Sequence, residues 1–491
     1  MHRILGTETE FGILAKGAGH SDPVTDSIRL ISHYPTLPSP QGIWDYENEN
    51  PFFDARGFLV EGEPERPNIR HNRQLNKLLL NGGRLYVDGA HPEYSTPECT
   101  QPLKLLAYER AGERMINLCL QALNSTQESD TFFVYKNNSD GKGNSYGYHE
   151  NYLLSRSVPF DKIANTLIPF FVTRQIFTGA GKVGSENGTD AVDYQISQRS
   201  DFFECVMDLN TMVKRPIINT RDEPHTEKDK FRRLHVIVGD ANMAEIPTYL
   251  KIGTTAIIME MLDAGWEFPK IVLKDPVRDI KTVSRDVAVK ASLRLTNGQA
   301  TSSVDIQRTY LQAAYEFFNT RDLPPETKDV LVSWERILDK LEQDPTQLGR
   351  ELDWVAKQQM IQSFMDRKVC GWKDPRIALL DLQYHDMRPD KGLYFTLERG
   401  KRIERLLQDS DIEQAMVKPP LNTRAYFRGT CLKQFAEKVY GVSWTSVLLD
   451  QGNDTIKRIP LMDPYRGTRA LTNDLLEGVS TVEQLLTKLS K

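Results

Sequence analysis

The chain has 491 residues and a formal net charge of -5 at pH 7, and no basic block interrupts it, so we expect no nucleic-acid partner. Its five cysteines are scattered and form no C-x-x-C pair. The sequence therefore predicts neither a disulfide framework nor a cysteine zinc site. No apolar run approaches the roughly 20 residues of a membrane span, and the opening MHRILGTETE lacks the apolar core of a signal peptide. We therefore expect a cytoplasmic, monomeric protein with no membrane partner.

The first predicted strand is RILGTETEFGIL, which carries two acids. Side chains two positions apart on a strand share a face, so Glu8 and Glu10 should point the same way, flanked by Leu5 and Phe11. Two acids on one face repel each other unless a cation lies between them. The pair is therefore a candidate metal site.

The next segment, residues 15–70, is rich in Pro, Gly, Asp and Glu and contains WDYENENPFFDARGF. It predicts a long irregular loop, a feature that inside a compact domain is usually functional or disordered. Aromatic residues argue against disorder, since disordered segments are depleted in them. We expect a partly mobile active-site loop over about 38–70, and a disordered insertion is the alternative.

A short helix over 71–81 should stop at Gly82-Gly83, before a second polar strand in RLYVDGAHPEYSTPEC. Arg84, Tyr86 and Asp88 share one face of it. Gly89 and Pro92 are expected to break the ladder, so that two further polar side chains, His91 and Glu93, turn in a new direction. Polar residues on outer edge strands are the alternative, but the repetition on two strands favours a site.

Further strands with polar faces follow, separated by helices. A helix over 101–124 and a strand over 131–135 precede HENYLL, where His149 and Asn151 share a face; a lone histidine there could equally be structural. Arg221 lies at the mouth of a strand, and Arg233 shares a face with His235 on the next strand. Helices are also expected over 160–181 and 246–265, and a strand over 194–200. Together these patterns predict an α+β fold with a curved, mainly antiparallel sheet backed by helices.

The rest of the chain is predicted to form a helical scaffold followed by a small domain. Residues 285–410 are mostly helical by pattern, and Pro419-Pro420 marks a boundary near residue 418. We expect a catalytic domain over 1–418 and a small α/β domain over 419–491. Within the latter, Trp444 is a candidate for stacking on a base, and a core tryptophan is the alternative.

Carboxylates, a tyrosine and histidines on strands, with arginines beside them, suit divalent cations and phosphate oxygens. ATP with Mg²⁺ is the natural inference. The sequence contains no G-x-x-x-x-G-K-[ST] and no kinase signature set, so it predicts neither a P-loop nor a protein-kinase site. Asp88 is the residue expected to act directly on a carbonyl or on water.

Several long motifs resemble the family that contains the Pup ligase and the depupylase, itself similar in its catalytic sheet to glutamine synthetase and glutamate-cysteine ligase. These motifs are GTETEFG, RLYVDGAHPEYSTPEC, YKNNSDGKGNSYGYHENY, INTRDEPH, RRLHVIVGDAN and TRAYFRG. The segment WDYENENPFFDARGF and the DGAHPEY spacing look like the depupylase branch of this family. The stretches after Glu61 and over 185–193 depart from its pattern.

The resemblance implies hydrolysis of the isopeptide bond between the last Pup residue and a substrate lysine, and deamidation of a C-terminal glutamine of Pup. Pup and pupylated proteins would be the partners, with ATP and Mg²⁺ as bound cofactors. A Pup ligase and a non-catalytic Pup-binding protein are the alternatives. The resemblance also implies site roles: Asp88 and Arg221 catalytic; Arg84, Thr96, Asn151, Arg233 and Trp444 at ATP; and Glu8, Glu10, Tyr86, Glu93, His149 and His235 at magnesium.

Overall fold

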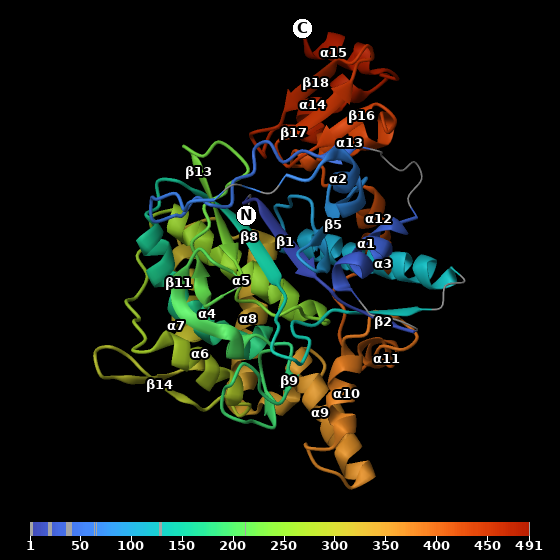
Figure 1. The fold of residues 1–491 in the computed structure, drawn as a ribbon. Coiled ribbons are helices and arrows are strands. Elements are labelled where there is room, and N and C mark those ends of the chain that lie inside the picture. The colour runs from blue at the N-terminus through green and yellow to red at the C-terminus, as the bar shows by residue number, and fades with distance from the viewer. Residues whose placement is uncertain are drawn as a thin grey trace.

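A computed structural model describes residues 3–17, 22–35, 42–62, 64, 66–126, 130–211 and 213–490 (Figure 1). Its largest sheet has six strands in the order β13-β8-β1-β6-β5-β4, and every neighbouring pair is antiparallel. In that order the strands are Phe231–Val236, Tyr148–Ser155, Leu5–Glu10, His91–Ser95, Arg84–Asp88 and Asn76–Leu78. The predicted antiparallel sheet is confirmed.

The two faces of this sheet differ in character. Leu5 and Leu85 point into the core and are buried, while Glu8 and Glu10 alternate with buried threonines and face the other way. Side chains from five of the six strands line a single cleft on that polar face.

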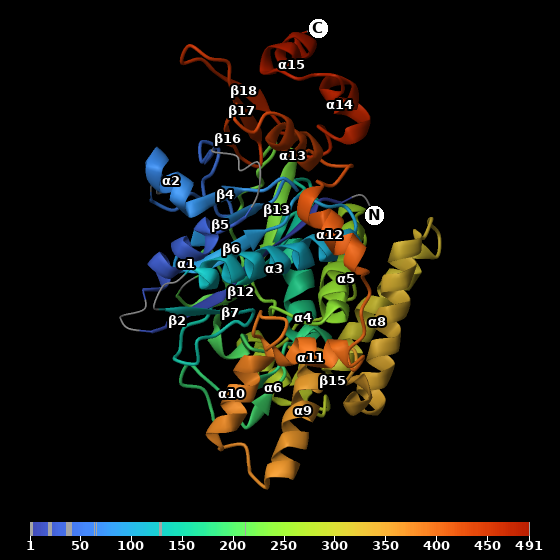
Figure 2. The same ribbon diagram turned by 90° about the vertical axis from the view of Figure 1, so that its right-hand side faces the viewer.

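Helices cover the apolar face in two layers (Figure 2). The first layer contains α3 (Pro102–Ser125) and α5 (Glu245–Asp263), which pack directly on the strands. The second contains α4 (Phe160–Thr178), α7 (Ser303–Phe318) and α8 (Pro325–Gln343), which pack against α5. Because α5 lies between the sheet and the second layer of helices, it is buried and apolar on nearly all sides. The helices predicted over 101–124, 160–181 and 246–265 are confirmed, and none of the described helices is long and apolar enough to cross a bilayer.

Shorter elements complete the large unit. The helices are α6 (Pro276–Arg285), α9 (Asp353–Lys368), α10 (Pro375–Tyr384), α11 (Leu393–Arg399) and α12 (Asp409–Val417), with short 3-10 turns at Ser200–Phe202 and Pro345–Leu348. The small sheets pair β2 (Gly12–Lys16) with β7 (Thr131–Tyr135), β9 (Lys182–Val183) with β10 (Tyr194–Gln195), β11 (Phe203–Asp208) in parallel with β12 (Arg215–Asn219), and β14 (Ser292–Arg294) with β15 (Ala300–Ser302). The predicted strand over 194–200 is thus limited to its first two residues, and the β14–β15 hairpin was not predicted.

The prediction of one irregular loop over 15–70 is wrong where α1 (Pro23–Ser32) forms. Asp22 caps this helix by accepting a hydrogen bond from a backbone N–H, Pro23 occupies its first position, and Leu30 is buried against the core. Proline and acidic residues at the start of a helix are also common in turns, so the sequence pattern did not indicate this helix. Residues 18–21, 36–41, 63 and 65 of the predicted loop lie outside the described residues.

Two local predictions around the polar strands are also corrected. The helix expected over 71–81 ends early: α2 is Ile69–Leu75, and the chain then extends as β4 because it pairs with β5, where Asn76 accepts hydrogen bonds from the Arg84 guanidinium. Pro92 does not break the ladder. It lies within β6 opposite Val87, and the chain reverses in the two-residue turn that begins at Gly89.

The C-terminal segment folds on a second sheet, in the order β18-β17-β16-β3. Its strands are Ile456–Pro460, Ser446–Asp450, Val439–Val442 and Ile43–Trp44, and its helices are α13 (Ala425–Gln434), α14 (Arg469–Leu476) and α15 (Val482–Leu489). The fourth strand, β3, comes from the N-terminal region and runs parallel to β16. These elements share a separate small core that includes Trp44 and Phe427. The boundary at residue 418 stays a prediction.

A buried ion-pair cluster ties the two sheets together. Glu98 follows β6, and it accepts hydrogen bonds from Arg424 (Nε to Oε1, 2.7 Å) and from Arg428, both at the start of the C-terminal segment. Burial alone would raise the pKa of Glu98, but the two guanidinium groups lower it to about 2. The carboxylate is therefore charged at any pH where the protein is handled, and it fixes α13 against the main sheet.

We predict that Glu98→Gln destabilises the protein by about 3–5 kcal/mol, because it leaves two buried guanidinium groups without their shared carboxylate. Denaturant unfolding followed by tryptophan fluorescence measures the change. The matched control is Glu342→Gln, which removes an exposed partner of Arg308 and should cost less than about 1 kcal/mol. Equal effects of the two variants would show that the cluster does not hold the sheets together.

Candidate active site

A cleft of about 1480 Å³, partly open to solvent, lies on the polar face of the main sheet. Eleven of the thirteen residues singled out in the sequence line it: Glu8, Glu10, Arg84, Tyr86, Asp88, Glu93, His149, Arg221, Arg233, His235 and Trp444. The other two, Thr96 and Asn151, line an adjoining pocket of about 560 Å³. The structure therefore brings together residues from across the chain at one continuous site.

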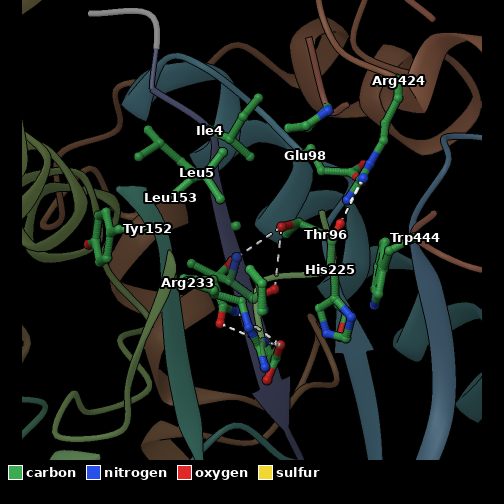
Figure 3. A pocket seen from close by; sticks show the side chains of 17 residues that line it. Ile4, Leu5, Thr96, Glu98, Tyr152, Leu153, His225, Arg233, Arg424 and Trp444 are labelled. Atoms are coloured by element: carbon green, nitrogen blue, oxygen red, sulfur yellow. Dashed lines mark hydrogen bonds and ion pairs between the residues drawn. The ribbon is translucent and has the colours of Figure 1, made fainter. Parts of the chain in front are cut away.

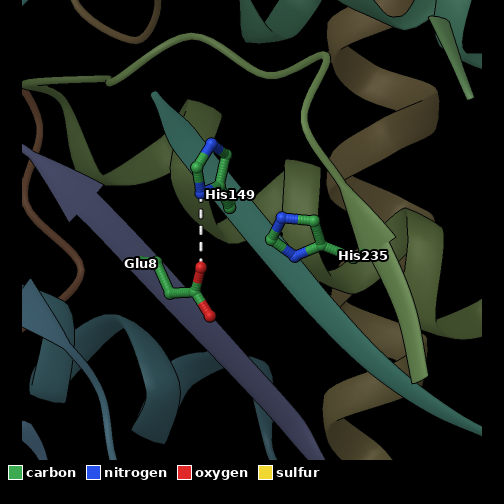
Figure 4. A group of neighbouring side chains, drawn as sticks. All are labelled: Glu8, His149 and His235. Carbon is green, nitrogen blue, oxygen red and sulfur yellow. Dashed lines mark hydrogen bonds and ion pairs between the residues drawn. The ribbon is translucent and has the colours of Figure 1, made fainter. Parts of the chain in front are cut away.

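Strand register explains one cluster in the cleft. Glu8 on β1 is opposite His149 on β8, and His235 comes from β13 on the other side of β8 (Figure 4). Oε2 of Glu8 lies 3.2 Å from Nδ1 of His149, and one ligand atom from each of the three residues lies within 4.8 Å of the others. Burial lowers the pKa of His235 well below its usual value, so its imidazole is neutral and able to bind a metal.

A second cluster joins three carboxylates from three strands. Glu10 on β1 is opposite Glu93 on β6, and Asp88 ends β5; their carboxylate oxygens lie within 4.8 Å of one another. Burial, followed by the charges of Asp88, Glu10 and Glu8, raises the pKa of Glu93 well above its usual value. Without a cation these groups repel one another, so the cluster is electrostatically incomplete as protein alone.

The surroundings of the Glu93 carboxylate show whether a metal ion fits this cluster. Both of its carboxylate oxygens are buried, and neither has a hydrogen-bond partner of ordinary geometry among the described residues. A buried carboxylate without partners is costly, and oxygen ligands are what Mg²⁺ prefers. The donor set of carboxylates and imidazoles therefore fits divalent cations, at Glu8, His149 and His235 and at Glu10, Asp88 and Glu93.

Asp88 stands apart from the other acids because its side chain is exposed in the cleft. The turn at Gly89, whose φ is +53°, presents it at the end of the strand. Although solvent reaches it, the cleft walls desolvate the carboxylate and, with the charges of Glu10 and Glu8, raise its pKa. A carboxylate of raised pKa is a stronger base, and an exposed one can reach a substrate.

Arg84 is held by aromatic rings. Its guanidinium carbon lies 4.2 Å from the ring centroid of Trp44, 5.3 Å from that of Tyr46 and 3.9 Å from that of Tyr86. Cation–π contacts of this kind, when desolvated, are worth about 2 kcal/mol or more. Arg84 therefore fixes the position of Tyr86 and the adjacent loop, in addition to lining the cleft.

A hydrogen-bonded chain connects the first cluster to the adjoining pocket. Nη1 of Arg233 donates to Oδ1 of Asn151 at 3.0 Å, and Nδ2 of Asn151 donates to Oε1 of Glu8 at 3.0 Å. Nδ1 of His235 lies 2.9 Å from the same Asn151 oxygen. The predicted nucleotide residues Asn151 and Arg233 are thus in direct contact with predicted metal ligands.

The adjoining pocket is lined mainly by apolar groups, including Leu5 and Leu153 (Figure 3). Thr96 lies on its wall, where its hydroxyl accepts a hydrogen bond from the Thr7 N–H. Trp444 lies at its edge, half-buried, with its ring centroid 5.0 Å from that of Trp44. An apolar slot next to cations and a metal-type cluster has the character of a site for the base and sugar of a nucleotide.

The sequence analysis missed several residues of the cleft. His225 lines both cavities, and burial lowers its pKa to about 4, so it is neutral; Glu49 and Glu223 line the cleft beside it. A signal existed, because Arg221, Glu223 and His225 are spaced two apart, as on the polar strands. No pattern of spacing indicated Glu49.

The 42–62 segment of the predicted active-site loop lies against this part of the cleft. Its backbone N–H groups bond to the Glu223 carboxylate from Asn50 at 2.6 Å and to the Thr220 carbonyl from Ala55 at 2.7 Å. Tyr46, Glu49 and Pro51 line the cleft. The segment therefore forms a wall of the site and braces the strand end that carries Arg221.

Acids, imidazoles and arginines are thus gathered on one face of the sheet, beside an apolar slot, a set of side chains that suits divalent cations and phosphate oxygens. The chain matches a family model described as Pup-ligase protein over residues 3–448. It is 44% identical to a depupylase of Acidothermus cellulolyticus, over 100% of this chain and 99% of the relative. A Pup deamidase/depupylase of Mycolicibacterium smegmatis is 41% identical over 100% of both chains, and a Pup–protein ligase of Rhodococcus opacus is 39% identical over 94% and 96%. The chain therefore belongs to the Pup-ligase protein family.

Solved structures agree with this assignment. The crystal structure of the complex between Pup and its ligase PafA has a TM-score of 0.81 and 32% identity, covering 100% of this chain and 94% of that chain. PafA in complex with ADP has a TM-score of 0.74 and 35% identity, covering 86% and 95%. The expected family is confirmed, and with it the expectation that the chain is an enzyme.

We predict opposite effects of Glu93→Gln with and without metal. Without metal the variant should have a higher melting temperature than the parent, because it removes a buried carboxylate from a group of like charges. In the parent, Mg²⁺ or Mn²⁺ at about 100 times its Kd should add about 2.7 kcal/mol of stability, and the variant should lose most of that gain.

Differential scanning fluorimetry across a metal titration measures both effects, with Glu342→Gln as the surface control. A variant that is stabilised by metal as strongly as the parent would remove Glu93 from the metal site.

Proposed function

We propose that the protein is a depupylase and Pup deamidase. It hydrolyses the isopeptide bond between the side-chain carboxyl of the last Pup residue and a substrate lysine. Where Pup ends in glutamine, it converts that residue to glutamate. The observation that carries this proposal is the exposed Asp88 at the edge of the acid cluster, in a chain whose relatives at 41–44% identity are named depupylase.

Pup and pupylated proteins are the proposed partners. The name of the relative at 41% identity includes Pup deamidase, and the structural neighbour with a TM-score of 0.81 is a ligase in complex with Pup. Both the ligase and the depupylase must accommodate the same end of Pup, so one cleft can serve either reaction.

The proposed cofactor is ATP with Mg²⁺. The neighbour solved with ADP supports a nucleotide, and the apolar slot beside Trp444 and Thr96 is the place where its base and sugar fit. Asn151, Arg233 and Arg84 are the proposed polar contacts. Glu8, Glu10, Tyr86, Glu93, His149 and His235 are the proposed metal ligands. When bound, the metal and phosphates would polarise the scissile carbonyl and stabilise the oxyanion that develops on it.

Asp88 acts on the carbonyl carbon in one of two ways. As a nucleophile, its carboxylate oxygen bonds to the carbonyl carbon, the C–N bond breaks, and the lysine nitrogen takes a proton from a water molecule in the cleft and leaves as the amine; the hydroxide so formed then hydrolyses the acyl-aspartate and regenerates the Asp88 carboxylate. As a general base, it takes a proton from water while the water oxygen bonds to the carbon, and that proton passes to the departing amine. In both cases the products are a side-chain carboxylate and a free lysine, or ammonia when the substrate is glutamine.

Arg221 is the proposed partner for charge on the carbonyl oxygen or on a phosphate. It lines the cleft next to Glu223, and its Nε is buried without a hydrogen-bond partner among the described residues. A donor left free in this way is available to a ligand. The hydrogen bonds from the 42–62 segment to Glu223 and Thr220 keep Arg221 in place.

A Pup ligase is the second candidate, since Pup–protein ligases at 38–39% identity belong to the same family. The two activities separate when a Pup–lysine conjugate is incubated with the protein and a non-hydrolysable ATP analogue. We expect release of free Pup, which gel electrophoresis and mass spectrometry would detect. Formation of conjugate from free Pup and ATP, with no release from preformed conjugate, would assign the ligase activity instead.

We predict that Asp88→Asn lowers kcat for release of Pup by at least about 10³-fold, because an amide can neither attack the carbonyl nor accept the proton. Nucleotide affinity should stay within about threefold of the parent, since Asp88 lies outside the apolar slot. Single-turnover cleavage of a fluorescent conjugate and nucleotide titration measure the two quantities.

The matched control is Asp390→Asn, a change at an exposed aspartate that lines neither cavity. Its cleavage rate should equal that of the parent. If Asp88→Asn also cleaves like the parent, Asp88 is not the catalyst. If the parent binds conjugates without cleaving them, the protein is a non-catalytic Pup-binding protein.

A further inference from the structure

A third cavity, of about 1680 Å³, lies outside the site described above. None of the residues that line it lines the cleft or the adjoining pocket. It forms where α12 packs on α3, and its other walls come from the 418–422 segment, α13 and α14 (Figure 2). It is named the α12 groove below. The groove thus lies at the junction between the helices that back the main sheet and the C-terminal segment.

Four cations line the α12 groove, and each comes from a different part of the chain. Lys104 is on α3, Lys418 follows α12, Lys433 is on α13 and Arg469 begins α14. All four residues are exposed, and none forms an ion pair with a carboxylate in the part of the chain that the structure describes. Because their elements surround one cavity, the four positive charges act on the same space.

Acidic counter-charge in the groove is small. Among the described residues that line it, Asp411 is the one acid, and its carboxylate already accepts a hydrogen bond from the Gln408 N–H at 3.2 Å, which caps α12. The groove is therefore positively charged, although the whole chain has a net charge of -5. A basic cavity on an acidic protein is suited to an anionic partner.

Exposed aliphatic side chains lie among these cations. Leu421 lines the groove with 51% of its surface exposed. Its carbonyl accepts a hydrogen bond from the Arg469 N–H at 2.7 Å, which fixes this part of the chain against α14. Val417 directly precedes Lys418, and Leu471 is two residues after Arg469; both are more than half exposed. Exposed apolar groups beside unpaired charges are typical of a surface that binds another protein.

The α12 groove does not have the exposed aromatic rings of a nucleic-acid site in the part of the chain that the structure describes. Tyr108 is buried, and its hydroxyl donates to the carbonyl of Lys418 at 2.9 Å. Tyr426 is half-buried, and its hydroxyl donates to Oδ1 of Asn473 at 3.1 Å. Single-stranded nucleic acids bind by stacking their bases on exposed rings, so this lining favours a protein partner.

We infer that the α12 groove binds an acidic segment of a second protein, in which aspartate or glutamate residues alternate with aliphatic residues. The acids would pair with the four cations, and the aliphatic side chains would contact Leu421. This inference goes beyond the proposed function and does not depend on it. Glu98 and Arg424 line the adjoining pocket, whereas their neighbours Cys99 and Asn422 line the groove, so the buried ion pair separates the two cavities. A partner in the groove therefore leaves the cleft open.

Fluorescence anisotropy with synthetic peptides and the full-length protein tests the inference. The probe is a fluorescein-labelled peptide in which pairs of glutamate alternate with single leucines. Its controls are a peptide with glutamine in place of every glutamate and a peptide with serine in place of every leucine. At physiological ionic strength we expect the parent protein to bind the probe at least about 10-fold more tightly than the glutamine peptide, and more tightly than the serine peptide.

Charge reversal in the groove is the main comparison between variants. Lys104→Glu combined with Lys433→Glu should weaken binding of the probe by at least about 10-fold, because two attractive charges become repulsive. Leu421→Ser should weaken binding by a smaller factor. The matched control combines Lys270→Glu with Lys274→Glu, which changes the net charge equally at exposed lysines that line none of the three cavities. It should bind the probe like the parent.

Hydrogen–deuterium exchange locates the bound peptide, and we expect protection over 101–108 and 411–433. The melting temperature of the groove variants and their rate of Pup release should equal those of the parent, since the changed residues are exposed and lie outside the cleft. Absence of saturable binding, equal loss in the groove variant and its control, or protection confined to the cleft would overturn the inference. So would tighter binding of a single-stranded RNA or of polyphosphate than of the probe. A parent that binds the probe but releases no Pup would refute the proposed function alone.

Discussion

The repulsion between acids on one face of the main sheet is the constraint on which the site depends. The pairing of β1 with β6 and of β6 with β5 places carboxylate oxygens of Glu10, Glu93 and Asp88 within 4.8 Å of one another, and Glu8 lies two residues along β1. Strand pairing fixes these positions, so the side chains cannot separate to relieve the repulsion. The protein alone therefore holds an excess of negative charge that a bound cation would neutralise.

Positively charged side chains lie around this group of acids. Arg233 lies 3.6 Å from the Glu8 carboxylate, and His149 is hydrogen-bonded to the same carboxylate. The aromatic rings around Arg84 hold the Arg84 guanidinium without cancelling its charge. The cleft thus changes in character from an apolar pocket beside Leu5 and Thr96 to a group of acids around Glu93.

Strand periodicity made much of this site predictable from sequence. Two-residue spacing identified Glu8 and Glu10, the Arg84 strand, and the Arg233–His235 pair, and those side chains do share one cleft. Spacing could not show how the strands are ordered in the sheet, which depends on pairing between distant segments. Arg199, which also lines the cleft, had no such signal, because it lies in an irregular segment after β10.

The prediction failed where local composition and tertiary pairing disagree. The segment after Leu75 has the apolar spacing of a helix but extends because β5 offers it a partner, and α1 begins with residues that elsewhere form turns. Pro92 is tolerated within a strand because its carbonyl still accepts a hydrogen bond from the Phe11 N–H. Each error comes from reading a segment without its neighbours in space.

The parallel pairing of β3 with β16 has a consequence for how the molecule is made. Ile43 pairs with Gly441, so a wall of the cleft near the beginning of the chain is ordered by a strand near its end. A ribosome synthesises the first before the second, and closure of so long a loop is slow. The nascent chain can complete its central sheet early, but the tryptophan pair at the mouth of the slot can assemble only after translation is nearly finished.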